Sequence, residues 1–122
     1  MTEQQFRNEL HYFTGSENFY RHGIGKLQLI YTDGVDYVVK NCACYWLLDV
    51  ILSWQLDKKL NNEAFQVWHL MKEEATDTWR ITCEDGNDNL LLEQQIGYSD
   101  FPFLGVQLWF IDKQVLMLPS EY

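Results

Sequence analysis

The apolar run from Ala43 to Leu56 constrains the fold of this chain more than any other segment. Eleven of its 14 residues are apolar or aromatic, so a helix formed here must be covered over most of its circumference. The run is shorter than the ~20 residues that a membrane span needs, and Asp49 interrupts it. The sequence therefore predicts a buried helix over about residues 43–58.

Two further helices are expected in the N-terminal half. Thr2 is a good N-cap residue, and Phe6 and Leu10 follow it at helical spacing, which predicts a helix over about residues 2–12. A shorter helix of one or two turns is expected at residues 35–40. Together with the buried helix, these segments form the helical part of the chain.

After residue 61 the spacing of apolar residues changes from helical to alternating, which is typical of strands. Residues 84–88 have strong hairpin-turn chemistry, and Asp112-Lys113 is a plausible two-residue turn. Earlier in the chain, Gly23 and Gly25 predict a loop, and Leu27–Tyr31 is either a strand or an extended connector. The five strand candidates are residues 64–71, 78–83, 89–96, 106–111 and 115–118.

This order of elements predicts an α+β fold. A chain of 122 residues has the length of one domain. Helices that come first and strands that come later favour an antiparallel sheet with helices packed on one face. We therefore expect a single domain in which the helices at about 2–12, 35–40 and 43–58 pack on a C-terminal antiparallel meander of about five strands.

The charge of the chain is concentrated in its last 50 residues. Residues 73–122 hold ten carboxylates and two bases, a net charge of −8, whereas residues 1–72 hold eight acids and seven bases, a net charge of −1. Such crowding of like charge is electrostatically unfavourable and favours a basic partner. The same charge repels the phosphate backbone of nucleic acids and anionic membranes, so direct binding to either is not expected.

The sequence also predicts where the protein resides. The first residues are polar and lack the apolar core of a secretory signal. The chain has three cysteines, an odd number without the spacing of a disulfide framework, which indicates reduced thiols. We expect a cytoplasmic protein, without a cofactor, that could form a homo-oligomer.

A series of short motifs resembles a family of small bacterial, phage and plasmid proteins that is filed as a domain of unknown function. The resemblance runs from about residue 12 to the end, and its most specific segments are YTDGV at 31–35, YWLLD at 45–49 and LPSEY at 118–122. Cys42 and Cys44 stand where small residues are expected, so the resemblance implies no thiol chemistry common to the family. The family's association with mobile elements favours a role in conflict between hosts and invaders.

Two patterns suggest ligand sites but fail on spacing. The acidic segment 84–89 lacks the EF-hand arrangement, because Gly86 stands at the wrong place and the twelfth position of a loop starting at Asp85 is Ile96. Residues 23–26, Gly-Ile-Gly-Lys, lack the gap before Gly-Lys and the following Ser or Thr of a phosphate-binding loop. A solvated hairpin tip and a glycine loop are the simpler interpretations.

The sequence gives little support for a catalytic thiol or a metal site. His22, Cys42 and Cys44 could in principle form a nucleophile with its base, but their spacing does not place them within hydrogen-bond reach. His11 and His69 add no metal-ligand pattern, and the Cys-x-Cys segment lacks a second pair of ligands at zinc spacing. We therefore predict neither catalytic nor metal-binding residues.

Our leading hypothesis is an acidic, non-enzymatic inhibitor that imitates a row of phosphates. Complementary charge steers such a protein to a basic, nucleic-acid-targeting partner and fixes its register there. An anti-CRISPR and an immunity protein against a nuclease would both recognise their target through such complementary charge. The predicted contact carboxylates are Asp77, Glu84, Asp85, Asp88 and Glu93, with Tyr98 and Phe101 as aromatic anchors.

The alternative is a protein that binds or sequesters a small molecule or nucleotide derivative. Tyr45, Asp49, Ser53 and Asp57 recur at intervals of four, forming one polar stripe on the apolar helix. This stripe either faces water or a neighbouring loop, or it includes a buried Asp49 that is held by Arg21 or His22 of the glycine loop. The predicted pocket residues are Tyr20, Arg21, His22, Trp46 and Asp49.

Overall fold

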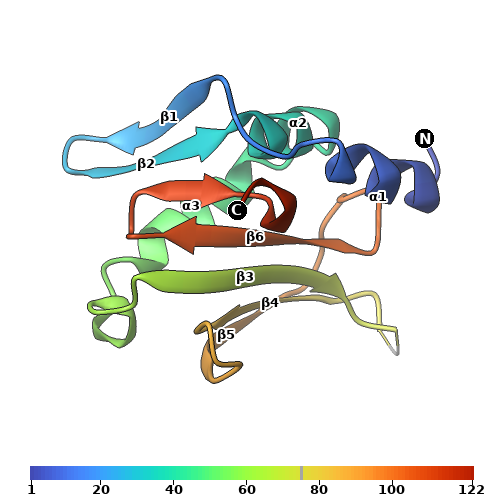
Figure 1. The fold of residues 1–122 in the computed structure, drawn as a ribbon. Coiled ribbons are helices and arrows are strands. Elements are labelled where there is room, and N and C mark those ends of the chain that lie inside the picture. Colours follow the sequence, from blue (N-terminus) through green and yellow to red (C-terminus); the bar gives the residue numbers. More distant parts are fainter. Residues whose placement is uncertain (75) are drawn as a thin grey trace.

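The computed structural model describes residues 1–74 and 76–122. Within them the chain forms three α-helices and seven strands (Figure 1). In chain order the elements are α1 (Glu3–His11), β1 (Phe19–Ile24), β2 (Leu27–Thr32), α2 (Asp33–Asn41), α3 (Tyr45–Trp54), β3 (Phe65–Lys72), β4 (Trp79–Glu84), β5 (Leu90–Ile96), β6 (Gly105–Ile111) and β7 (Val115–Met117), with short 3-10 helices η1 (Lys58–Leu60) and η2 (Pro119–Glu121).

The seven described strands form one mixed sheet in the order β1-β2-β7-β6-β3-β4-β5. All neighbouring strands are antiparallel except β2 and β7, which run parallel and pair Ile30 with Val115. The predicted α+β class is confirmed. The expected antiparallel meander of about five strands is wrong in three respects. The sheet has two more strands, it contains one parallel pair, and β6 pairs with β3 rather than with its predecessor β5.

The two additional strands form an N-terminal hairpin. The glycine segment, predicted to be a loop, is the turn of this hairpin, since Ile24 pairs with Leu27 across Gly25 and Lys26. Gly25 has a φ of +61° and Gly23 a φ of +124°, conformations that glycine adopts without strain. Leu27–Tyr31 is therefore strand rather than connector, and it carries the hairpin into the sheet.

The helices differ from the predicted ranges at their ends. Helix α1 is confirmed, with Thr2 and Gln5 forming a capping box. Helix α2 begins at Asp33, two residues early, because the hydroxyl of Thr32 accepts a hydrogen bond from the N–H of Val35. Helix α3 is shorter than the expected range of 43–58 at both ends. Its N-terminal limit follows from the left-handed backbone of Ala43, with a φ of +50°.

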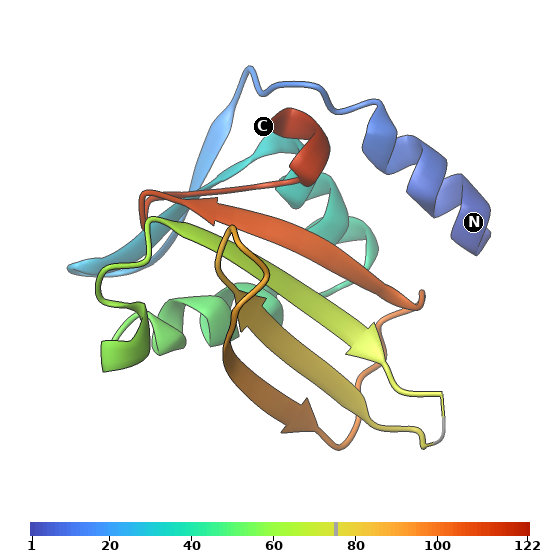
Figure 2. The same cartoon turned by 60° about the horizontal axis from the view of Figure 1, so that its bottom comes forward.

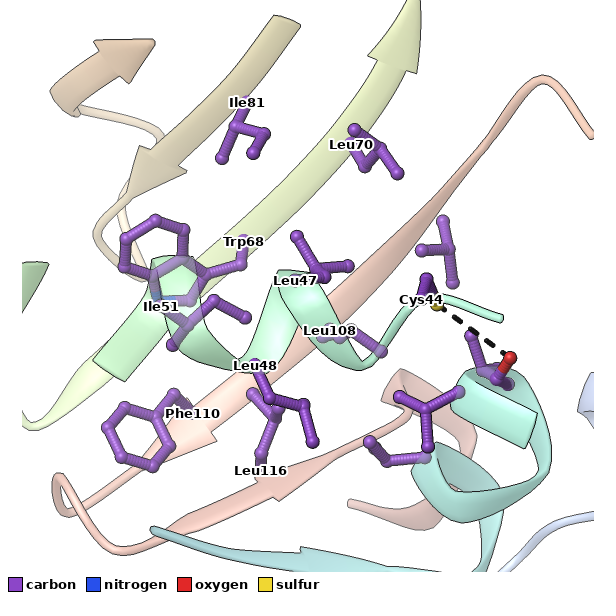
Figure 3. Close-up of a cluster of buried hydrophobic side chains, with 14 of the residues drawn as sticks. Cys44, Leu47, Leu48, Ile51, Trp68, Leu70, Ile81, Leu108, Phe110 and Leu116 are labelled. Carbon is purple, nitrogen blue, oxygen red and sulfur yellow. Dashed lines mark hydrogen bonds between the residues drawn. The ribbon is translucent and has the colours of Figure 1, made fainter. Parts of the chain in front are cut away.

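The core lies between one face of the sheet and helices α2 and α3 (Figures 1 and 2). Figure 3 shows Leu47, Leu48 and Ile51 of α3 against the inner side chains of β3, β4, β6 and β7. These side chains alternate along each strand, as Trp68 and Leu70 do in β3. We call this side of the sheet the covered face.

The other side of the sheet, which we call the open face, carries the remaining residues of each strand. Helices α2 and α3 lie on the covered face, and α1 borders the open face near Gln107. The side chains of the open face are mostly half-buried. Short helix η2 reaches this face near β6, where the ring of Tyr122 lies 5.3 Å from Trp109 and 5.6 Å from Phe65. Phe65 and Trp109 are themselves 5.2 Å apart. We call these three residues the aromatic trio.

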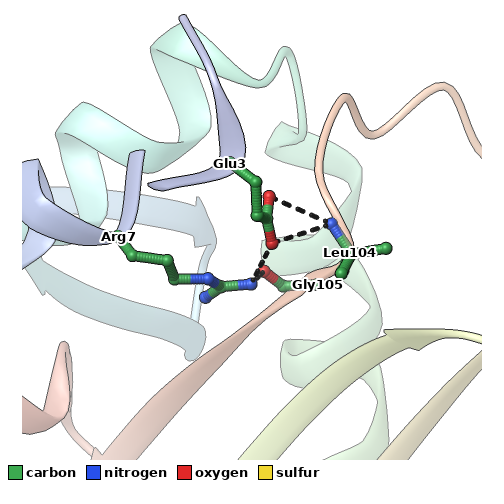
Figure 4. Close-up of polar contacts among 4 residues, drawn as sticks. All are labelled: Glu3, Arg7, Leu104 and Gly105. Atoms are coloured by element: carbon green, nitrogen blue, oxygen red, sulfur yellow. Dashed lines mark hydrogen bonds and ion pairs between the residues drawn. The ribbon is translucent and has the colours of Figure 1, made fainter. Parts of the chain in front are cut away.

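Helix α1 is anchored at one end of the sheet. Phe6 is fully buried and stacks on Phe103 with ring centroids 4.2 Å apart. The guanidinium of Arg7 donates to the carbonyl of Gly105 at 2.6 Å, and Glu3 accepts from Arg7 and from the N–H of Leu104 (Figure 4). These contacts fix the loop that leads into β6.

The last residues of the chain are tied to the beginning of α2. Glu121 accepts hydrogen bonds from the N–H of Gly34, the hydroxyl of Thr32 and the N–H of Leu118. A carboxylate is favourable at this position because the first N–H groups of a helix are unpaired and carry partial positive charge. Segments 31–35 and 118–122, far apart in the sequence, thus form one structural unit.

Candidate functional site

Three of the predicted contact carboxylates lie together at the tip of the β4–β5 hairpin. Glu84 ends β4, and Asp85 and Asp88 follow in the turn. The carboxylate of Asp85 accepts hydrogen bonds from the side chain and N–H of Asn89 and from the N–H of Asn87, which together lower the pKa of Asp85. Asp85 therefore stabilises the turn, whereas Asp88 is exposed and free of such bonds among the described residues.

The other two carboxylates lie elsewhere. Asp77 is in the turn between β3 and β4, at the opposite end of β4 from Asp85; six strand residues separate the ends by ~20 Å. Glu93 lies on β5, where one of its oxygens is 3.3 Å from the guanidinium of Arg80. The five predicted carboxylates therefore do not form a single row, and the concentrated charge is at the hairpin tip.

The two predicted aromatic anchors differ sharply in exposure. Tyr98 is 78% exposed, but Phe101 is only 5% exposed. The Phe101 ring packs edge-on against Phe6 and Trp79, with centroids 6.3 and 5.8 Å away. Phe101 is a core residue rather than an anchor, because the apolar loop after β5 closes over the end of the sheet.

Sequence reasoning missed the aromatic trio, which lies beside the hairpin tip. A Cβ placed on Gly86 would be 3.4 Å from the Phe65 ring, so the turn packs against that ring. In the sheet, Val67 pairs with Glu84 on one side and Trp109 on the other, which brings the carboxylate and the trio onto the same face. The trio could have been found from the alternation of β3 and β6. This alternation places Phe65 and Trp109 on the same face as His69 and Gln107.

The alternative pocket is only partly assembled. Nε2 of His22 is 2.7 Å from a carboxylate oxygen of Asp49, as one version of that prediction required, but Asp49 is 70% exposed rather than buried. The Tyr20 hydroxyl instead donates to Asp33 at 3.2 Å. Arg21, between Tyr20 and His22 on β1, points to the opposite side of the sheet.

Trp46 lies on another flank of α3, next to β5. With Ile96, Tyr98 and Asp100 it lines a cavity of about 260 Å³. Another cavity, of about 510 Å³, lies between the end of α3 and Gln94 of β5, and Trp54, Leu56 and Asp57 also line it. The five residues of the alternative prediction therefore do not line a common pocket. Tyr45, Asp49 and Ser53 of the polar stripe face water.

The three cysteines are buried and unpaired by disulfides. Burial raises the pKa of Cys42 to about 11 and the pKa values of Cys44 and Cys83 to about 12. At neutral pH these thiols are protonated, and a protonated thiol is a poor nucleophile. The imidazole of His22 contacts Asp49 and not a thiol.

Within residues 1–74 and 76–122, no group of three His, Cys, Asp or Glu side chains is arranged to hold a metal ion. None of the helices described in this part of the chain has the length and apolar character required to cross a membrane.

A family model described as a family of unknown function (DUF6876) matches residues 4–122. The chain belongs to this family. The motifs indicated a family of unknown function, and the match over residues 4–122 confirms that this DUF6876 protein belongs to one. No match was found for it among curated proteins or among solved structures.

Proposed function

We propose that this protein is an acidic, non-enzymatic binding module that inhibits a basic, nucleic-acid-targeting protein or ribonucleoprotein. The observation that carries the proposal is the position of Glu84, Asp85 and Asp88 together at the tip of the β4–β5 hairpin, directly beside the aromatic trio. An anti-defence protein of the anti-CRISPR kind and a nuclease-immunity protein both fit this description. The proposed site of action is the cytoplasm.

The combination of charge and rings at the hairpin tip has the composition of a protein interface. Aromatic side chains supply most of the binding free energy in many interfaces, and a charged rim steers the partner and excludes wrong ones. Tyr122 is exposed, while Phe65 and Trp109 are half-buried, so apolar surface is available next to the carboxylates. The buried thiols argue against a cysteine nucleophile.

The proposal predicts salt-sensitive capture of a basic partner. The tagged protein, used as bait in host lysate, should retain a basic nucleic-acid-binding protein at low salt and release it at high salt, because salt screens exposed charges. Mass spectrometry identifies the retained protein, and purified partner then shows whether its nucleic-acid cleavage is inhibited. Retention of no protein at low salt would contradict the proposal, as would a partner whose activity is unaffected.

A further inference from the structure

We propose that the edge of β5 binds an extended segment of a basic partner protein as an eighth strand, with basic side chains at alternate positions. Two cavities lie between β5 and α3, which Trp54 and Gln94 join by a hydrogen bond, and we call these two cavities together the groove. This inference rests on the proposed function, since it specifies how a basic partner is recognised. It assigns a role to the edge of the β4–β5 hairpin, whereas the proposed function concerns its tip.

The first supporting feature is the free edge of the sheet. Strand β5 is the last strand in the sheet order, and it pairs only with β4. Among the described residues, no backbone hydrogen bond joins its outer side to another element. Natural edge strands often carry lysine or proline, which discourage further pairing, but β5 has neither. Its outward N–H and C=O groups are thus available to an added strand.

The second feature is a pair of neighbouring cavities along this edge. Gln94 lines the cavity of about 510 Å³ and Ile96 the cavity of about 260 Å³. These residues are two positions apart, so they lie on the same side of β5 at a spacing of ~6.6 Å. Side chains i and i+2 of an added strand have this same spacing. One extended segment can therefore place one side chain in each cavity.

The third feature is the shared chemistry of the two cavities. One combines Trp46 with Asp100, and the other combines Trp54 with Asp57. A long basic side chain fits such a pair, because its cation is attracted to the face of an indole and its N–H groups bond to the carboxylate. Arginine is the better match, since its planar group can stack and bond at once.

The two cavities are not equivalent in charge. Asp57 already accepts a hydrogen bond from the N–H of Lys59, and Lys58 and Lys59 follow it in the chain. No described hydrogen bond uses the carboxylate of Asp100, which is exposed. We therefore expect the Asp100 cavity to contribute more to the binding of a basic segment.

A second copy of this chain is a poor occupant of the groove. Each chain carries a net charge of −9, so two copies repel each other. The side chains that a second β5 would offer to the cavities, Leu92, Gln94 and Ile96, include no base. The carboxylates beside the cavities favour an occupant of opposite charge, which a basic partner protein supplies.

Fluorescence anisotropy with labelled synthetic peptides tests this mode of binding. The probe is an eight-residue peptide in which arginine alternates with valine. One control has the same composition with the four arginines in a block. A second has N-methyl groups on every residue, which removes the backbone donors on both edges of the peptide without changing its charge. We expect the alternating peptide to bind at least tenfold more tightly than either control at equal salt.

Variants of the protein locate the peptide. Asp100→Asn should weaken binding of the alternating peptide about fivefold to tenfold, and Asp57→Asn should weaken it less. Asp77→Asn, the same change in charge at the remote turn, should alter the dissociation constant less than twofold. Equal binding of all three peptides, no binding of the alternating one, or equal effects of Asp100→Asn and Asp77→Asn would overturn the inference.

The outcomes also separate this inference from the proposed function. If the alternating peptide fails but a captured basic partner still depends on the hairpin tip, strand addition is wrong and the proposed function stands. If the peptide binds as expected but no basic partner is captured, the groove is supported and the proposed inhibition is not.

Discussion

Replacing Gly105 with alanine should lower the free energy of unfolding by about 4 kcal/mol, which combines backbone strain with overpacking. Gly105 begins β6 with a φ of +152°, a conformation that side chains disfavour. An added Cβ would overlap the carbonyl oxygen of Leu70 on the neighbouring strand. The same residue accepts a hydrogen bond from Arg7, so any shift of its backbone would also loosen α1 (Figure 4).

Urea denaturation of the purified variant measures this loss. Gly97→Ala is the matched control, because a Cβ at Gly97 would meet no atom within 4 Å and its φ is not positive. We expect the control to change stability by less than about 1 kcal/mol, as is usual for surface positions. If both variants unfolded at the same urea concentration, the close approach of β6 to β3 at this point would be wrong.

Replacing Trp68 with alanine is the second change with a large expected effect. It should lower the free energy of unfolding by about 4 kcal/mol. Trp68 is 1% exposed on the covered face, and its Nε1–H donates to the side-chain oxygen of Gln66 at 2.9 Å. Truncation would leave a large cavity beneath α3 and remove a hydrogen-bond donor from the buried amide of Gln66.

Trp109→Ala is the control for this prediction, because Trp109 is a tryptophan on the neighbouring strand whose side chain lies on the open face. The sheet pairs Trp68 with Leu108, so Trp109 points to the other side. Trp109 is half-buried, and its Nε1–H has no partner among the described residues. We expect Trp109→Ala to lower the free energy of unfolding by at least about 2 kcal/mol less than Trp68→Ala does. Thermal unfolding of both variants measures the difference, and equal losses would contradict the assignment of the two faces.

The class of fold could be predicted because the strongest patterns were local. The apolar run after Ala43 required a covered helix, and the alternation after residue 61 placed β3 to β7 to within about two residues. The N-terminal hairpin was missed because its glycines resemble loop residues, and because β2 joins the sheet through a parallel pair with β7. That pairing depends on contacts between segments more than 80 residues apart, which periodicity does not reveal.

The candidate site was predicted less well than the fold. The sequence correctly indicated a turn at the hairpin tip, but it could not show that Asp77 and Asp85 lie at opposite ends of β4. Phe101 looked like a loop anchor because its burial depends on Phe6, which is distant in the sequence. The cavities beside β5 arise where one flank of α3 meets the sheet edge, a relation that no single motif encodes.

Paired charge neutralisation tests the central claim most directly. Glu84→Gln with Asp88→Asn removes two charges at the hairpin tip, and Glu74→Gln with Asp77→Asn removes two at the remote turn. The association rate constant for the captured basic partner should fall about tenfold for the first pair, with a weaker dependence on salt, and less than twofold for the second. Equal rates for the two double variants would contradict the account, because net charge and not the hairpin tip would then determine binding.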